Sequence, residues 1–415
     1  LDQYYKRVGD MMEVKTVPVG QWTDRMRLMQ EGAEAIGEGQ HFRPVELAVR
    51  FDEDWRPGPD AYDPARSKRG INAHGIEQGS CVHLGRCDLG CPVDARNTLD
   101  RNYLAVAEKH GAEVRPLHLV RRIEPVAGGY AVSGNDVSGG VKRRFTVNAA
   151  RLIVAAGSLG STELLLRARD VQKTLPKLSE RLGYGWSSNG DFLTPARHHG
   201  RRGGPTRGIT IGSAIDFTES PRGGHRIFIE DGGFPSVLHI LLEQAIAQGH
   251  IPKPLARLFR GAIDGLKADT VEEIMPWFAQ GMDAGDGRLR LGRPWWRPCR
   301  QDLLLDWEID KSEAMFRAIE KTHHELARET GGTVIPLPNW KLGKNLITPH
   351  PLGGCNMADS PAAGVVNEFG KVFGYENLYV IDGAMVPRAI GRNPSRTIAA
   401  LAERCAERMP AGPST

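Results

Sequence analysis

The chain has 415 residues, of which 40% are hydrophobic and 25% charged, so it can bury a sizeable core and is not globally disordered. Its net charge of +4 comes with short, scattered basic runs, which argues against a nucleic-acid partner. No apolar run approaches the length of about 18 residues that a membrane span needs, and no signal peptide is visible, which favours a cytoplasmic protein.

The first third of the chain predicts helices followed by short strands. Residues 22–36 have loose helical spacing, and residues 98–110 predict a further helix. Short strand signals follow at 113–123, 129–133 and 144–148. Two of these flank a glycine turn, which is typical of a meander.

Residues 151–165 combine an all-apolar run, a few small residues and a helix. Such a run suits a strand that is buried on both faces. Backbone amides at the start of the following helix favour an anion or a closely approaching cofactor. A plain tight turn between strand and helix is the alternative.

A block of strands and helices lies between two blocks that look like parts of a nucleotide-binding domain. We expect strands at 207–230, 287–291 and 303–307, and helices at 237–247, 255–266, 271–282 and 312–330. This order suggests a substrate domain inserted into a discontinuous α/β domain. A final helix is predicted at 395–409, with Asn393 as its N-cap and Pro394 at its first position.

The most unusual stretch is 348–355, in which His350 stands between two prolines, ahead of a glycine pair. About forty residues later, a short apolar run ends in Asp382 and Gly383, and Asn393 precedes a proline. The two stretches offer an imidazole and an amide on constrained backbone, and most of the functional argument depends on them.

Taken together, the motifs resemble those of the glucose–methanol–choline (GMC) flavoprotein oxidoreductases, and within them the cholesterol oxidase branch. The residues that carry the resemblance occur in order at 97–104, 156–165, 186–191, 350–355, 377–383 and 391–394. They cover nearly the whole chain, with a looser match over 200–340. The resemblance implies an α/β (α+β two-domain) fold, with an FAD-binding Rossmann-like domain and an inserted mixed-sheet substrate domain.

The implied division of the chain has four parts. They are a connecting or cap segment at 1–70, FAD-domain parts at 71–195 and 341–415, and a substrate-binding domain at 196–340. The last part carries the expected catalytic histidine and asparagine.

The resemblance implies oxidation of an alcohol to a carbonyl by hydride transfer to FAD, with His350 as base or substrate orienter and Asn393 as its partner. Histidine titrates near neutrality, so it can take a hydroxyl proton directly or through an ordered water. An amide beside it can hold the substrate oxygen. The structural alternatives are a capped histidine and a simple N-cap asparagine.

Glu230 ends a predicted strand at the place where cholesterol oxidases carry a catalytic carboxylate. The next residues, Asp231, Gly232 and Gly233, depart from the family pattern, so Asp231 can take its place. An ordinary carboxylate at a strand end is the further alternative.

For FAD, the resemblance points to one backbone position near the adenine and to several turns near the phosphates and the ring. These residues are Val120, Ala156, Gly157, Asn189, Gly190, Asp382, Gly383 and Pro394. The implied substrate is a sterol or another bulky apolar alcohol, with Trp277, Trp295 and Trp296 as candidate lining residues. The implied second partner is oxygen or another electron acceptor.

The family's dinucleotide fingerprint, G-x-G-x-x-G between a strand and a helix, does not occur in the 415 residues. We therefore expect an incomplete FAD-binding domain, whose other part lies in a missing N-terminal segment or in a companion chain, and weak FAD binding by these residues alone. The alternative functions are an incomplete chain or subunit that is inactive alone, and a flavin dehydrogenase that passes electrons to a non-oxygen acceptor.

Cys81, Cys87 and Cys91 have a spacing that can ligate an iron–sulfur cluster, with His83 as a weak fourth candidate. Four ligands are usual, however, and three cysteines are present. We favour structural cysteines in a glycine-rich turn, so no metal site is expected.

Overall fold

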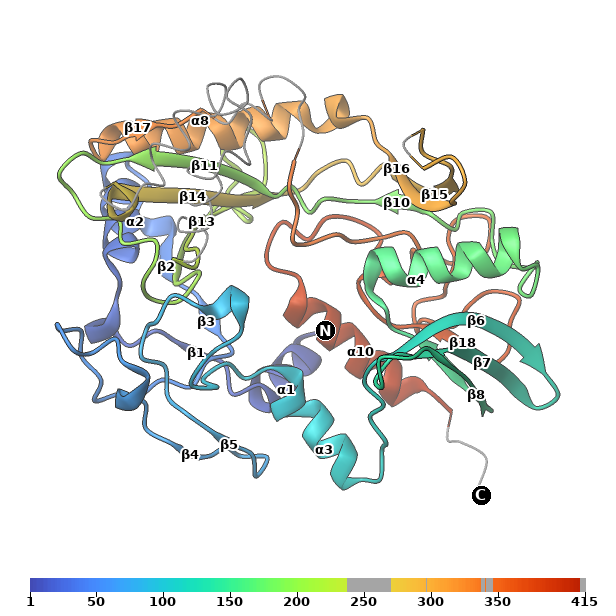
Figure 1. The fold of residues 1–415 in the computed structure, drawn as a ribbon. Coiled ribbons are helices and arrows are strands. Elements are labelled where there is room, and N and C mark those ends of the chain that lie inside the picture. Colours follow the sequence, from blue (N-terminus) through green and yellow to red (C-terminus); the bar gives the residue numbers. More distant parts are fainter. Residues whose placement is uncertain (237–269, 296, 337–339, 341–345, 411–415) are drawn as a thin grey trace.

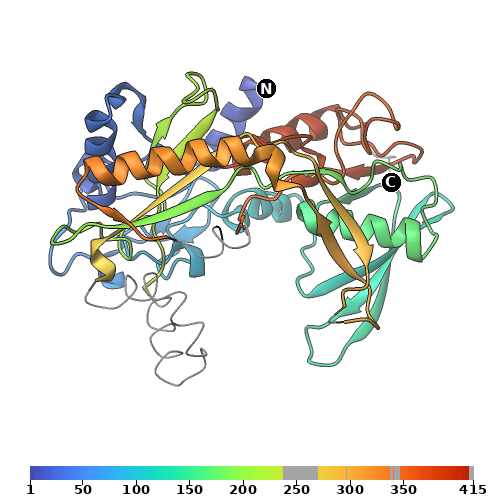
Figure 2. The same ribbon diagram turned by 90° about the horizontal axis from the view of Figure 1, so that it is seen from above.

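The described residues of the computed structural model are 1–236, 270–295, 297–336, 340 and 346–410 (Figure 1). The helices expected at 237–247 and 255–266 lie outside these residues. The described elements gather around two groups of strands, one under the long helix α8 and one beside α4, and the helix α10 lies between them (Figures 1 and 2).

A six-stranded sheet forms the first group. In spatial order its strands are β17 (Thr333–Val334), β11 (Phe192–Arg197), β14 (Ile274–Gly281), β13 (Ile227–Asp231), β12 (Ser213–Asp216) and β2 (Phe42–Pro44). Every neighbouring pair is antiparallel. The expected mixed sheet is therefore wrong for the described strands. A short connection joins β12 to β13, and such connections produce antiparallel neighbours.

This sheet crosses the domain division expected from the sequence. The expected boundary between residues 195 and 196 falls inside β11, and the edge strand β2 comes from the segment 1–70. Hydrogen bonding between strands therefore joins segments that the sequence assigned to different parts.

Two helices cover one face of the six-stranded sheet, α2 (Asp24–Ala35) and α8 (Glu313–Glu329) (Figure 1). Thr23 caps α2 by accepting a hydrogen bond from the backbone amide of Met26. Apolar residues at helical spacing on both helices then face the sheet. The buried members of this core include Met29, Ala33, Phe316, Ile319, Leu326, Ile215, Ile229, Trp277 and Ala279.

The segment 271–282, expected as a helix, instead contains the central strand β14, which follows a single 3-10 turn at Val271–Glu273. The apolar run from Ile274 to Ala279 carries no clear period, because all but one of its side chains are buried. Its backbone groups pair with β11 on one side and β13 on the other. These tertiary partners decide the conformation.

The second group of strands begins with an antiparallel meander of β6 (His118–Val126), β7 (Gly129–Asp136) and β8 (Arg143–Ala149). The meander predicted from the sequence is thus confirmed. The strand β9 (Leu152–Val154) then runs into α4 (Gly157–Leu166) and pairs in parallel with β18 (Leu378–Val380). Figure 2 shows the hairpin of β15 (Gly287–Gly292) and β16 (Asp302–Asp306) beside α4. It joins β10 (Tyr184–Trp186).

The strand β9 is not buried on both faces within the described residues. Val154 is buried, but the Ile153 side chain between it and Leu152 is 46% exposed. The expectation drawn from the apolar run therefore holds for one face only, because the described neighbours of β9 cover a single side.

The two ends of the described chain pack together. The helix α1 (Asp2–Met11) lies against α10 (Ser395–Arg408), with Tyr4, Val8 and Ala400 in the contact. The remaining short elements are β1 (Lys15–Thr16), β3 (Glu46–Leu47), β4 (Gly70–Ile71), β5 (Glu77–Gln78) and the helix α3 (Tyr103–Lys109). None of the helices in the described part of the chain is long and apolar enough to cross a membrane.

Candidate active site

Glu230 is held by two side-chain amides. Nδ2 of Asn393 donates to its Oε1 at 2.6 Å, and Nε2 of Gln280 donates to its Oε2 at 2.8 Å. The same nitrogen of Gln280 lies 3.4 Å from Oδ1 of Asn393. The three side chains therefore close a small ring of polar contacts that joins β13, β14 and the residues before α10.

Strand alternation places this ring on the face of the sheet that α2 and α8 leave open. Ile229 and Ala279 are paired in register and belong to the core under the helices. Successive side chains point to opposite faces, so Glu230 and its register partner Phe278 project from the other side. Gln280, two residues beyond Phe278, shares that face.

Asn393 does not cap α10, as the sequence had suggested. The helix begins at Ser395 with Pro394 in the N-cap position, and no side chain bonds there. A cap would need the oxygen of Asn393 to face backbone amides, whereas its nitrogen is turned to the carboxyl of Glu230.

Complete burial raises the pKa of Glu230 from 4.5 to about 8. The hydrogen bonds from Gln280 and Asn393 favour the ionised form and limit this rise, while the nearby charges of Asp231 and Asp191 add to it. A carboxyl group with such a pKa can hold or release a proton near neutral pH.

Asp231, the alternative to Glu230, faces the other side of the sheet. Its Oδ2 lies 3.7 Å from Nε of the fully buried Arg25, and its Oδ1 accepts from the backbone amides of Gly212 and Ser213 at 2.9 and 2.5 Å. These contacts bind α2 to the sheet. Glu230, and not Asp231, lies beside Asn393.

His350 is paired with a buried carboxylate. Its Nδ1 lies 2.8 Å from Oδ1 of Asp191, whose side chain is fully buried, while the imidazole side chain is 19% exposed. Oδ2 of Asp191 accepts from the hydroxyl of Thr348 at 2.5 Å and from the backbone amide of His350 at 3.2 Å. Since an ionised carboxylate can only accept, Nδ1 carries the proton and Nε2 is left as the basic nitrogen.

Phe278 connects the two polar groups. It stands opposite Glu230 in the strand register, and its ring lies 6.4 Å from the imidazole of His350, centroid to centroid. The charge of Asp191 also acts on Glu230. His350, Glu230 and Asn393 therefore lie in one region, although they are far apart in sequence.

The glycine pair that follows His350 permits close chain crossings. Both residues have positive φ, and a Cβ on Gly353 would stand 2.0 Å from the carbonyl oxygen of Gly185. A Cβ on Gly354 would stand 2.2 Å from the hydroxyl of Thr162 on α4. The motif seen in the sequence thus reflects packing of the His350 loop against β10 and α4.

Asn189, expected at the cofactor, fixes the loop that carries Asn393. Its Oδ1 accepts from the amides of Ile390 and Gly391, and its Nδ2 donates to the carbonyl of Arg392. The neighbouring Gly190 has positive φ and packs against the backbone of the β14 end, where a Cβ would stand 2.4 Å from the oxygen of residue 281.

Asp382 ties the end of β18 to the start of α4. Its Oδ2 accepts from the amide of Gly157 at 2.8 Å and from the hydroxyl of Ser161 at 2.5 Å, and its Oδ1 accepts from the amide of Ala384. Burial raises the pKa of Asp382 against the effect of these hydrogen bonds. Gly383 is buried next to it.

The turn between β9 and α4 fits the close approach of a cofactor. Gly157 has a φ of +77°, and a Cβ there would meet nothing within 4 Å, while Ala156 is exposed. The amide of Gly157 itself already faces Asp382, so the anion expected at this amide is a carboxylate of the protein. Val120 is half-buried in the meander opposite Gly134.

The tryptophans expected to line a cavity do not gather at the site. Trp277 is fully buried in the core under α2 and α8, and Trp295 is 87% exposed. Trp296 lies outside the described residues. Trp277 is therefore a core residue, the alternative to a lining residue, because strand alternation turns it away from Glu230, and Trp295 is a surface residue.

The cysteine-rich turn is packed rather than open. The thiol sulfur of Cys81 accepts from the amide of His83, and that of Cys91 accepts from the amide of Ala95. The imidazole of His83 stacks on Trp55 with centroids 4.4 Å apart. Among the described residues, no group of three or more histidine, cysteine, aspartate or glutamate side chains is placed to hold a metal ion.

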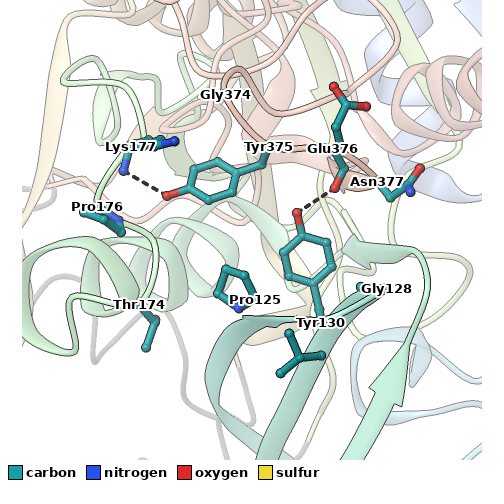
Figure 3. Close-up of a pocket in the computed structure, with 12 residues that line it drawn as sticks. Pro125, Gly128, Tyr130, Thr174, Pro176, Lys177, Gly374, Tyr375, Glu376 and Asn377 are labelled. Atoms are coloured by element: carbon teal, nitrogen blue, oxygen red, sulfur yellow. Dashed lines mark hydrogen bonds between the residues drawn. The ribbon is translucent and has the colours of Figure 1, made fainter.

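Figure 3 shows a cavity of about 580 Å³ elsewhere, beside the β6–β7 turn. Tyr130 donates its hydroxyl proton to the carbonyl of Glu376, and the hydroxyl of Tyr375 accepts from the amide of Lys177 (Figure 3). None of the candidate catalytic residues lines it.

Sequence reasoning did not single out Asp191 and Gln280 as members of the site. Asp191 is the last residue of the family motif at 186–191, and this position could have marked it as a candidate site residue. Gln280 had no such signal, because the segment around it was expected as a helix.

The chain is similar to known proteins of one family. Two family models described as GMC oxidoreductase match residues 3–174 and 285–402. A cholesterol oxidase from Acinetobacter baumannii is 30% identical over 438 residues, which cover 99% of this chain and 74% of that protein. A cholesterol oxidase from Mycobacterium tuberculosis is 30% identical over 431 residues, covering 98% and 71%.

Among solved structures, pyridoxine 4-oxidase from Mesorbium loti has the same fold, with a TM-score of 0.57 at 16% identity over 95% of this chain and 71% of that one. The class is therefore that of two-domain α/β oxidoreductases with an FAD-binding and a substrate domain, which use FAD and act on CH–OH donors. More narrowly, the chain belongs to the GMC oxidoreductase family.

Proposed function

We propose that the chain oxidises a bulky apolar alcohol, with a sterol as the first candidate, to the corresponding carbonyl compound. The similarity to two cholesterol oxidases supports this substrate class. So does the face of the sheet opposite α2 and α8, where the strand register places the apolar residues Leu193, Phe278 and Phe228 on the same side as Glu230 and Gln280. Leu193 is 43% exposed there, so an apolar substrate can lie against it.

In this proposal His350 takes the proton of the substrate hydroxyl at Nε2. The observation that carries it is the contact of Nδ1 with the buried carboxylate of Asp191. That contact holds the ring in one orientation, leaves Nε2 basic and stabilises the imidazolium once the proton has moved. Thr348 fixes Asp191 in turn.

Asn393 and Glu230 complete the substrate side. Asn393 is an exposed residue, and its amide nitrogen has one further N–H to offer to the substrate oxygen. Glu230, with its pKa raised to about 8 by burial, lies beside Asn393 and can hold or release a proton near neutral pH. In this arrangement His350 takes the hydroxyl proton while Asn393 holds the substrate oxygen.

When bound, FAD supplies the acceptor for the hydride that leaves the carbinol carbon. The residues of this chain expected near it are Ala156 and Gly157 at the β9–α4 turn, Gly383 after β18, Val120 in the meander, and Gly190 and Pro394. Asn189 and Asp382 would act through the loops that their side chains fix. Oxygen is the proposed final acceptor.

The test is turnover of the FAD-loaded protein with cholesterol and with 1,2-propanediol, measured as carbonyl product with a soluble dye as acceptor. We expect a strong preference for cholesterol and a loss of at least about a hundredfold in kcat for His350→Ala. The exposed His110→Ala is the control and should match the wild type. Turnover of the diol alone would reject the apolar substrate class.

A parallel assay without the dye decides the acceptor. Hydrogen peroxide formed in equal amount to the carbonyl product supports oxygen. Turnover that needs the dye, with no peroxide, supports a dehydrogenase.

A further inference from the structure

Gln280 is fully buried on β14 and is the third member of the ring around Glu230. Its Nε2 faces both Glu230 and Asn393, while its Oε1 is buried and has no hydrogen-bond partner among the residues that the structure describes. Buried amide oxygens are rarely left unpaired, because each lost hydrogen bond costs free energy. In Gln280 the lost hydrogen bond at Oε1 therefore accompanies the hydrogen bond that Nε2 donates to Glu230.

This orientation of the amide is the one that the ionised form of Glu230 requires. An ionised carboxylate offers only acceptors, so the amide must turn Nε2 toward it. Turned the other way, Oε1 of Gln280 would stand against a negative oxygen. A protonated Glu230 has an O–H to donate, and only then can the opposite orientation of Gln280 pair its oxygen.

We propose that Gln280 is a positioning residue that holds the Glu230 carboxyl and the Asn393 amide in their relative places and favours the ionised form of Glu230. The inference rests on the proposed function, in which Glu230 takes part in proton transfer. Gln280 acts through Glu230 and Asn393, and does not itself need to touch the substrate.

The test follows the ionisation of Glu230 directly. The carboxyl stretch of Glu230 is recorded by infrared difference spectroscopy against pH in the FAD-loaded protein, and Glu230→Gln identifies the band. In Gln280→Met one donor to the carboxylate is gone, so the midpoint should rise by about one pH unit.

Gln78→Met is the matched control. Gln78 is also fully buried, donates Nε2 to Asn97 at 2.8 Å and has an unpartnered Oε1, but it lies on β5. Its replacement should leave the Glu230 midpoint unchanged. A midpoint in folded Gln280→Met equal to that of the wild type would overturn the proposal.

Gln280→Asn keeps a buried amide that is one methylene too short to reach Glu230, and it serves if the methionine variant does not fold. It should raise the midpoint as well, and an unchanged midpoint counts against the proposal. The pH profile of kcat separates the two claims. If one limb of the kcat profile in the variant shifts together with the infrared midpoint of Glu230, both the role of Gln280 and that of Glu230 are supported. If the midpoint shifts and the kcat profile does not, the role of Gln280 is supported and the role of Glu230 in proton transfer is rejected.

Discussion

Asp191 decides which nitrogen of His350 carries a proton. The flanking prolines constrain the backbone, but the ring is oriented by a carboxylate that comes from 159 residues earlier in the chain. Asp191 is held by Thr348 and by the amide of His350 itself, so it cannot turn away. The buried carboxylate of Asp191 therefore fixes both the orientation of the imidazole and the nitrogen that can accept a proton.

Replacing Asp191 with asparagine tests this. The amide nitrogen of Asn can donate to Nδ1, which moves the proton to Nε2 and removes the basic nitrogen. We expect kcat to fall by about a hundredfold to ten-thousandfold with little change in the fold. Steady-state kinetics with cholesterol measures it, and Asp306→Asn, at a half-exposed carboxylate on β16, is the control. Activity equal to the wild type would contradict the assigned tautomer.

Glu230 links the site to stability. Its pKa is raised by burial from 4.5 to about 8, so the folded state keeps a proton that the unfolded state releases above 4.5. Its contribution to stability is complete below pH 4.5 and is lost as pH rises toward 8, at up to about 1.4 kcal/mol per pH unit.

The side chain of the Glu230→Gln variant cannot ionise. The melting temperature of the variant relative to that of the wild type should therefore increase between pH 5 and pH 9. Thermal melts at pH 5, 7 and 9 measure the difference. Glu219→Gln, at an exposed position, should track the wild type at every pH. A constant difference for Glu230→Gln would show that the carboxyl is already ionised at pH 5.

At the scale of elements, β13 carries two carboxyl groups to opposite faces. Glu230 faces the open side with Asn393, and Asp231 faces the covered side with Arg25 of α2. Arg25 also donates to the carbonyls of Gly204 and Ile209 at 2.6 and 2.5 Å. In β13, Glu230 therefore belongs to the candidate site, and the next residue, Asp231, binds α2 to the sheet.

Arg25→Met should destabilise the protein by about 3–5 kcal/mol, because it leaves Asp231 buried without its charge partner. The double variant with Asp231→Asn removes that charge and should recover part of the loss. Chemical denaturation of the wild type and both variants measures this. A double variant that is less stable than Arg25→Met would mean that Asp231 stabilises the sheet without Arg25.

At the scale of the whole molecule, the site is assembled from distant parts of the chain. His350 lies in the stretch 348–355, Asp191 precedes β11, and Glu230 is the last residue but one of β13. Asn393 precedes α10, which packs on α1 at the other end of the sequence. Buried histidines lie in the cores that hold these parts. His83 stacks on Trp55, and His323 bonds to Thr194 under α8.

Acid should loosen these cores. Desolvation lowers the pKa of His83 to about 4 and that of His323 to about 3, against 6.5 in the unfolded chain. Stability is therefore present above pH 6.5 and is lost as pH falls toward 4, by up to about 1.4 kcal/mol per pH unit for each histidine.

Unfolding free energies at pH 7, 6 and 5 measure this slope. His323→Gln cannot take up the proton, so its slope should be smaller by about one proton, while the exposed His110→Gln should keep the wild-type slope. An unchanged slope in His323→Gln would mean that this ring is not buried neutral.

The sequence alone determined the family motifs, the meander, the β9–turn–α4 unit and the final helix, because short-range spacing and turn residues specify them. It also pointed to His350, Asn393 and Glu230 through a motif match. The contact of Asn393 with Glu230 was not in that match, and their roles stay predictions. So does weak FAD binding by these residues alone.

Tertiary structure decided the rest. Only the sheet partners make 274–281 a strand, and that strand brings Gln280 to Glu230 and turns Trp277 away. Only the folded chain shows that Asp191 meets His350 and that Asp231 meets Arg25 instead of the site. The physical reason is that local sequence sets backbone preference, whereas burial and long-range hydrogen bonds choose which face and which partner each side chain receives.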